Sequence, residues 1–318
     1  MKEGSMEVYL RENGCFESKA GLDHRREVLL SLSVLAQQWL QSQTLEQGFN
    51  WQYSNEVTGK IVTYGSYMLG ISHQGADIDA LFIAPSHISR ESYFHSLYEL
   101  FGRQRQVTDL RAIEEAYVPV IKMKYDGIEI DMTFAKLHLP DIPPDLETFD
   151  NSMLKGLDQK CVRSLNGYRS TKRILSLVPH GEVFRLTLSQ GIYSNIMGYL
   201  GGFSWAVLVA KTCIMHPEVM EPERMWNWPE PVMLCPLEDD VENPSDYSMQ
   251  SWNPKKNPAE RFHVTRVMPI ITPTYPHLNS TFNVTQSTLK LIQDKMSTAV
   301  NTSSQILEGH DKWDSLFK

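Results

Sequence analysis

Residues 64–79 read YGSYMLGISHQGADID, a glycine-rich stretch that closes on an Asp-Ile-Asp pair at the head of an apolar run. The run at residues 77–84, DIDALFIA, is apolar enough for a central strand, and KIVTY at residues 60–64 predicts a short strand leading into the Gly-Ser pair. Alternate residues of a strand point to the same face. Asp77 and Asp79 are therefore expected to present both carboxylates on one side, roughly 6.6 Å apart along the backbone.

This pair of carboxylates favours a metal site. Two bare carboxylates so close repel each other, and one of them tends to stay protonated. A divalent cation removes the repulsion and uses both groups as hard oxygen ligands. The Gly65-Ser66 turn ahead of the pair can approach a phosphate with backbone N–H groups and a hydroxyl. Each feature alone is more often a solvated strand end or an ordinary turn, so the interpretation depends on what accompanies them.

A β-hairpin supplies a third acid. VPVIKMKY at residues 118–125 and IEIDMTFA at residues 128–135 flank Asp126-Gly127, a two-residue turn of the type I′ kind. In the second arm Asp131 lies on the polar face, opposite the apolar one. Three acids from two neighbouring strands can hold two Mg²⁺ ions roughly 3.5–4 Å apart, the layout used for phosphoryl or nucleotidyl transfer.

The remaining pattern predicts two domains. With 318 residues, 42% of them hydrophobic, the chain can bury two sizeable cores. Apolar residues at helical spacing predict helices at 24–40 and about 90–102, which together with the strands make a mixed α/β unit. Residues 152–213 read as helices, so the domain boundary is expected near residue 150. The uncharged run at residues 186–210 contains polar residues and glycines, which favours a buried helix over a membrane span.

The net charge of −8 excludes a general polyanion-binding protein, so any contact with nucleic acid must be local. The window 159–181 contains basic residues and no acid. It is interpreted as a local positive field for a triphosphate or RNA, with a solvated helix face as the alternative. Its basic side chains are Lys160, Arg163, Arg169, Lys172 and Arg173.

The order Gly-Ser, Asp-X-Asp, then an acid on a β-hairpin is the signature of the nucleotidyltransferase superfamily that resembles DNA polymerase beta. The chain resembles the nuclear poly(A) polymerases of eukaryotes over most of residues 45–318. The blocks that carry the resemblance are GADIDALFIAPSHISR, LRAIEEAYVPVIKMKYDGIEIDMTFAKL, CVRSLNGYRSTKRIL, IYSNIMGYLGGFSWAVLVAKT and MPIITPTYPHLNSTFNV. The resemblance implies an α+β protein: a polymerase-beta-like nucleotidyltransferase domain over residues 1–150 and a helical central domain over residues 151–318.

The resemblance also implies roles for individual residues. The catalytic metal ligands, for Mg²⁺ or Mn²⁺, would be Asp77, Asp79 and Asp131. Tyr64, Gly65 and Ser66 would flank the incoming ATP and its phosphates. Val118 and Asn166 would lie near the adenine and ribose, and Tyr193, Gly202 and Phe203 would complete the nucleotide pocket from the helical domain.

The function implied is the addition of AMP from ATP to an RNA 3′ end in the nucleus, alongside the cleavage and polyadenylation machinery and with no membrane partner. Two alternatives remain open from the sequence. One is a member of the family that binds ATP, RNA or protein partners but turns over poorly. The other is a related terminal transferase that uses UTP or CTP.

Two departures from the family pattern bear on activity. FRLTL at residues 184–188 runs through Ser189-Gln190-Gly191 straight into IYSN, where the family has a longer helix with a lysine that contacts the triphosphate. Losing such a cation predicts a rate lower by on the order of 10²–10³. The chain is also expected to stop, at Lys318, short of the family's C-terminal RNA-binding domain.

Overall fold

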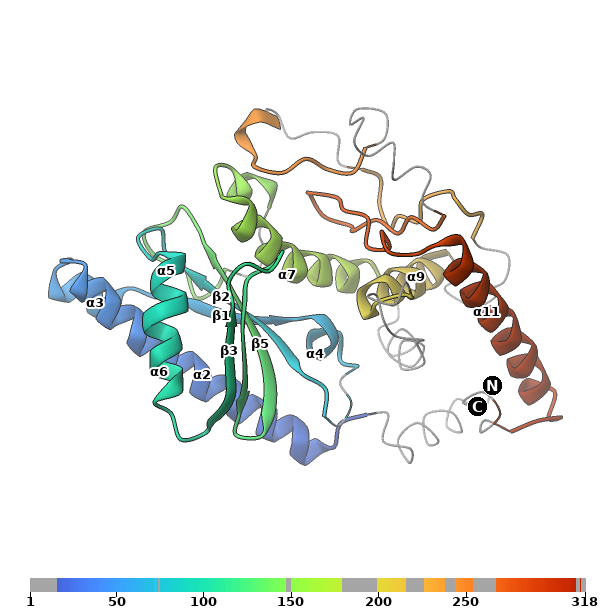
Figure 1. Cartoon of the computed structure of the whole chain (residues 1–318), viewed down its shortest axis with the longest axis horizontal. Coiled ribbons are helices and arrows are strands. Elements are labelled where there is room, and N and C mark those ends of the chain that lie inside the picture. The colour runs from blue at the N-terminus through green and yellow to red at the C-terminus, as the bar shows by residue number, and fades with distance from the viewer. Residues whose placement is uncertain are drawn as a thin grey trace. The chain divides into compact units, whose positions relative to one another are not determined.

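The computed structural model describes residues 16–71, 73, 75–146, 150–178, 199–215, 226–237, 244–253, 267–312 and 315 (Figure 1). The chain forms two compact units, and each is described by itself. The first unit contains Phe16–Thr171 and Asp240–Gln250. The second contains Lys172–Asp239 and Ser251–Lys318. The domain boundary expected near residue 150 stays a prediction.

The first unit is built on a mixed five-stranded sheet with the order β1-β2-β5-β4-β3. The strands are β1 (Lys60–Tyr64), β2 (Ile78–Ala84), β3 (Val107–Ile113), β4 (Val120–Tyr125) and β5 (Ile128–Lys136). The central pair, β2 and β5, is parallel, and the other neighbouring pairs are antiparallel. A parallel pair must be joined by a crossover connection, which here carries the helices after β2 and the strands β3 and β4.

The predicted hairpin is present between β4 and β5. Asp126 and Gly127 have φ angles of 48° and 84°, which are the positive values that both central residues of a type I′ turn require. The turn fixes the register, so that Tyr125 pairs with Ile128 and Lys122 pairs with Asp131. β3, which pairs with β4 at the edge of the sheet and is interrupted by a bulge, was not predicted from the sequence.

One hydrophobic core lies between one face of the sheet and the helices α2 (Lys19–Glu46) and α6 (Tyr98–Gly102). The predicted helix at about 90–102 consists of α5 (Arg90–Ser92), a π-helical turn and α6. Alternate residues of the central strands enter this core together with apolar side chains of α2. Trp39 of α2 meets Phe82 of β2 edge to face, with ring centroids 5.9 Å apart. The side chains between these core positions point out of the opposite face of β2 and β5.

Short helices connect and cover the strands. α3 (Trp51–Glu56) precedes β1, and α4 (Gly65–Leu69) follows it directly. The Gly-Ser pair, which was expected to form a simple turn, therefore opens a short helix. α7 (Gln159–Leu177) begins after Asp158, whose carboxylate accepts the N–H of Cys161 at 2.8 Å as an N-cap does.

The second unit contains α9 (Gly202–Met215) and α11 (Gln286–Leu307). Isolated bridges join Val232 to Ile270 and Ile271 to Asn279. The expectation of helices over residues 152–213 is met by α7 and α9, while residues 179–198 lie outside the described part of the chain. None of the helices that the structure describes is both long and apolar enough to cross a membrane.

Candidate active site

Two neighbouring strands carry the central carboxylates. Asp79 on β2 and Asp131 on β5 are direct partners in the parallel register. Their neighbours Ala80 and Met132 lie in the hydrophobic core, so the period of two sends both carboxylates out of the opposite face of the sheet. The position of each acid is therefore set by the strand that buries its neighbours.

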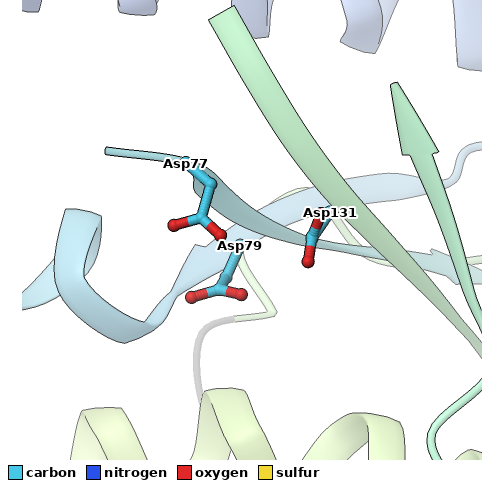
Figure 2. Close-up of side chains that lie close together, drawn as sticks. All are labelled: Asp77, Asp79 and Asp131. Carbon is cyan, nitrogen blue, oxygen red and sulfur yellow. The ribbon is translucent and has the colours of Figure 1, made fainter. Parts of the chain in front are cut away.

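The third carboxylate completes a compact cluster. Figure 2 shows Asp77, Asp79 and Asp131 side by side, and one oxygen from each lies within 4.8 Å of the others. Asp77 is exposed and precedes β2 by one residue instead of belonging to the strand, as had been expected. It nevertheless lies beside Asp79, so the convergence expected from the sequence is present.

The cluster concentrates negative charge at a partly buried position. Burial, and then the charges of Asp77 and Asp131, raise the pKa of Asp79 to about 7, while Lys122 acts in the opposite direction. Lys122 lies opposite Asp131 in the hairpin, and its ammonium forms an ion pair with the Asp131 carboxylate. One lysine against three acids leaves a surplus of negative charge on hard oxygen ligands. This donor set fits a divalent cation.

The chain turns from β1 into α4 at Tyr64 and Gly65, and this connection, called the turn from here on, approaches the cluster closely. Gly65 has a φ of +61°, and a Cβ added there would lie 2.2 Å from Oδ2 of Asp79. Only glycine meets both conditions, since other residues are strained at this φ and would overlap the carboxylate. The N–H of Gly65 donates a hydrogen bond to Oγ1 of Thr171 at 3.3 Å. One backbone N–H that was expected to face a phosphate is therefore already bonded to the protein.

Tyr64, the last residue of β1, packs against α7. A Cβ added at Gly167 of α7 would lie 2.8 Å from Cε2 of Tyr64, so the ring lies directly against the helix backbone. Burial and the charge of Asp79 raise the pKa of Tyr64 well above its usual range, which keeps the phenol neutral. Tyr64 is thus adjacent to the carboxylates but is held by packing.

The remaining predicted nucleotide contacts lie in both units. Asn166 is buried on α7 and accepts a hydrogen bond from the Ser170 hydroxyl at 3.4 Å. Val118 is half-buried and precedes β4 by two residues. Gly202 and Phe203 begin α9 in the second unit, and Tyr193 lies outside the described residues. The roles of these residues stay predictions.

The basic window differs from the expectation of an open positive field. The Arg163 guanidinium lies 3.9 Å from the centroid of the Tyr117 ring. The Lys160 ammonium donates to the Glu114 carbonyl at 3.3 Å. Buried Arg169 donates to Oδ1 of Asn151. These three cations contact groups of their own chain. Neither interpretation of this window, as a positive field for a triphosphate or RNA or as a solvated helix face, predicted these contacts.

Lys122 and Thr171 lie at this site but were not predicted from the sequence. Lys122 could have been found, because a two-residue turn at 126–127 fixes its pairing with Asp131. Thr171 could not, because its contact with Gly65 joins segments 106 positions apart and has no local pattern.

Comparison with known proteins shows which family models and relatives the chain matches. Residues 2–178 match the poly(A) polymerase nucleotidyltransferase domain, and residues 186–318 match the poly(A) polymerase central domain. Poly(A) polymerase pla1 of Schizosaccharomyces pombe is 39% identical over 97% of this chain and 56% of its own length. Nuclear poly(A) polymerase 4 of Arabidopsis thaliana is 38% identical over 98% of this chain and 44% of its own. The chain thus spans about half the length of these curated relatives.

Solved structures resemble the fold at low sequence identity. The Cid1 poly(U) polymerase with Mg and 3′-dATP bound has a TM-score of 0.57 at 13% identity, over 100% of this chain and 99% of that one. A cytoplasmic RNA terminal U-transferase has a TM-score of 0.52 at 16% identity, over 100% and 99% of the two chains. At these identities the likeness concerns the fold alone. Together with the family matches, it shows that the chain has a polymerase-beta-like nucleotidyltransferase fold and belongs to the poly(A) polymerase family.

Proposed function

We propose that the chain is a polynucleotide adenylyltransferase that adds AMP from ATP to RNA 3′ ends. The observation that carries this proposal is the cluster of Asp77, Asp79 and Asp131, with oxygens within 4.8 Å of one another. The names of the relatives support the choice of ATP and of a poly(A) product, and two of them support a nuclear location. We further propose the cleavage and polyadenylation machinery as its partner.

The three carboxylates would act as ligands for two divalent cations, Mg²⁺ or Mn²⁺. Such cations, when bound, lower the pKa of the attacking 3′-hydroxyl and neutralise the triphosphate. The sheet holds Asp79 and Asp131 in fixed register, so these ligands need little rearrangement. Lys122 holds the Asp131 carboxylate from the side of β4.

The other predicted residues would bind the nucleotide. The Ser66 hydroxyl and backbone would meet the phosphates, because Ser66 follows the glycine that lies against Asp79. Val118 and Asn166 would contact the adenine and ribose, with Tyr193, Gly202 and Phe203 completing the pocket. We expect direct transfer of AMP to RNA with release of pyrophosphate and without a covalent enzyme intermediate.

The test is incorporation of each of the four nucleotides into oligo(A) with Mg²⁺ or Mn²⁺. We expect metal-dependent incorporation of AMP, and loss of at least about 10²-fold in Asp131→Asn, because one ligand of the cluster is removed. Glu129→Gln is the matched control: it removes an exposed carboxylate two residues away on β5 that is outside the cluster. Its rate should stay within about twofold of wild type.

Other outcomes would point to the alternatives. Preferred incorporation of UMP or CMP would contradict the use of ATP and favour a different terminal transferase. ATP binding without incorporation would favour a member that turns over poorly. We also expect a rate far below that of a full-length relative, because Ser189-Gln190-Gly191 stands where a lysine-bearing helix was expected; these residues lie outside the described part of the chain.

A further inference from the structure

The Thr171 hydroxyl links α7 to the turn at the end of β1. It accepts the Gly65 N–H at 3.3 Å and donates to the Gly167 carbonyl, one helical turn back on α7, at 2.8 Å. Thr171 is 2% exposed, so water does not readily replace either bond. A hydroxyl with both its donor and its acceptor engaged has a defined orientation.

Gly167 provides a second contact between the same elements. A Cβ at this position would lie 2.8 Å from Cε2 and 3.0 Å from Cδ2 of Tyr64. These are atoms of the rigid ring of half-buried Tyr64, so they cannot move aside as the tip of a flexible side chain would. The absence of a side chain at Gly167 therefore lets the Tyr64 ring lie against the helix.

Both contacts hold the two residues that precede Ser66. Tyr64 and Gly65 lie against α7, and Gly65 lies so close to Asp79 that a Cβ would reach 2.2 Å from its carboxylate oxygen. The turn is thus confined between α7 on one side and the carboxylate cluster on the other. A shift of α7 would change the position of Ser66 relative to Asp79.

We infer that Thr171 and Gly167 are positioning residues that fix the distance between the phosphate-binding turn and the carboxylate cluster. This inference rests on the proposed function, since it assigns a partner to the turn that would meet the ATP phosphates. Thr171 is also the last residue of the first compact unit on α7, and Lys172 of the same helix belongs to the second. The contacts of Thr171 and Gly167 with the turn lie within the first unit.

The principal test is Thr171→Val, which keeps the shape of the side chain and removes the hydroxyl. The half-buried Gly65 N–H then loses its acceptor, and the turn relaxes away from α7. A displacement of about 1 Å in a positioning group can cost about 10²-fold in rate. We expect the KM for ATP to rise about tenfold, with the KM for the RNA primer unchanged.

The matched control is Thr212→Val. Thr212 is also a buried helical threonine whose hydroxyl donates to the carbonyl four residues back, at 3.1 Å, but it lies on α9 in the second unit. If the two variants lose similar thermal stability, a selective rise in the KM for ATP in Thr171→Val cannot come from instability alone. Gly167→Ala should have the larger effect, and Gly167→Ala combined with Tyr64→Leu should recover part of it.

Calorimetric binding of Mg·ATP and of Mg·tripolyphosphate separates this inference from the proposed function. We expect Thr171→Val to weaken both ligands about tenfold and Thr212→Val to weaken neither. If the wild-type chain binds both but transfers no AMP, the proposed function fails while this difference still stands. Equal binding by wild type and Thr171→Val, equal weakening in both valine variants, or no binding by the wild type would overturn the inference.

Discussion

Asp79 lies close to Gly65, is partly buried, and is repelled by the carboxylates of Asp77 and Asp131. Its pKa of about 7 lies above the ordinary 3.8, so the free energy of unfolding contains a penalty that is absent well below pH 4 and complete above pH 7. Asp79→Asn removes the charge with little change in shape. We expect this variant to stabilise the metal-free protein at pH 8 by about 2 kcal/mol, with no gain at pH 4. Urea unfolding at the two pH values measures both quantities.

Asp131→Asn is the contrasting variant, because Asp131 is paired with Lys122. It should give no comparable gain at pH 8. Added Mg²⁺ should raise the melting temperature of the wild type, since ligands that bind only the folded state stabilise it, and should do so much less in Asp79→Asn. A lower stability of metal-free Asp79→Asn at pH 8 would mean that burial of the charged carboxylate and its repulsion by Asp77 and Asp131 are not the dominant effects.

At the scale of elements, the start of α7 is stabilised by the contacts of Asp158, the residue directly before the helix. Burial acts to raise the pKa of Asp158, but the Cys161 N–H and Arg90 outweigh it and leave the pKa below the ordinary value. Asp158 therefore stabilises the fold above pH 4, and this contribution is lost as the pH falls through the lowered pKa. We expect Asp158→Ala to cost about 1–2 kcal/mol at pH 7, measured by urea unfolding, in line with the loss of other N-caps.

Asp158→Asn isolates the charge, because an amide oxygen can still accept the Cys161 N–H. It should cost less than the alanine variant, since only the ion pair with Arg90, at 3.0 Å, is weakened. The difference between Asp158→Ala and wild type should shrink when the pH is lowered to about 3. An alanine variant as stable as wild type at pH 7 would show that α7 is fixed by packing alone.

The elements also show what the sequence could and could not predict. β2 and the hairpin were predictable, because a buried strand is continuously apolar and the Asp126-Gly127 turn sets the register of its arms. β3 was not, since it is a mostly exposed edge strand with a bulge and its residues do not alternate. The clustering of Asp79 and Asp131 followed from strand parity, whereas the contacts of α7 with the turn are long-range hydrogen bonds and packing that leave no local pattern.

For the whole molecule, we expect the net charge to limit any binding of RNA. The chain has a net charge of −8, and several cations of α7 are engaged within the protein. Each phosphate contact on a single strand contributes a slope of roughly −0.7 to log K against log salt concentration. We expect weak binding to oligo(A) with a slope shallower than about −3, measured by fluorescence anisotropy at several salt concentrations.

Two arginines of α7 allow the expectation to be tested. Arg173 is exposed, so Arg173→Gln should make the slope less negative by roughly 0.7. Arg163 stacks on Tyr117 and should leave the slope unchanged when replaced by glutamine. A wild-type slope implying eight or more contacts would reveal a basic surface that these residues do not account for.

The parallel pairing of β2 and β5 has a consequence for synthesis of the chain. The Thr133 hydroxyl of β5 donates to the Ala80 carbonyl of β2 across 53 positions of the chain. During synthesis, β2 therefore cannot pair with β5 until the intervening helices and the strands β3 and β4 have been made. During that interval an apolar strand has an unpaired inner edge, which is the kind of surface that recruits strands from other chains. Two of the three carboxylates emerge from the ribosome early, but a metal-binding cluster does not exist until β5 docks. Cation binding by a nascent chain would therefore report that the most aggregation-prone stage of its folding has ended.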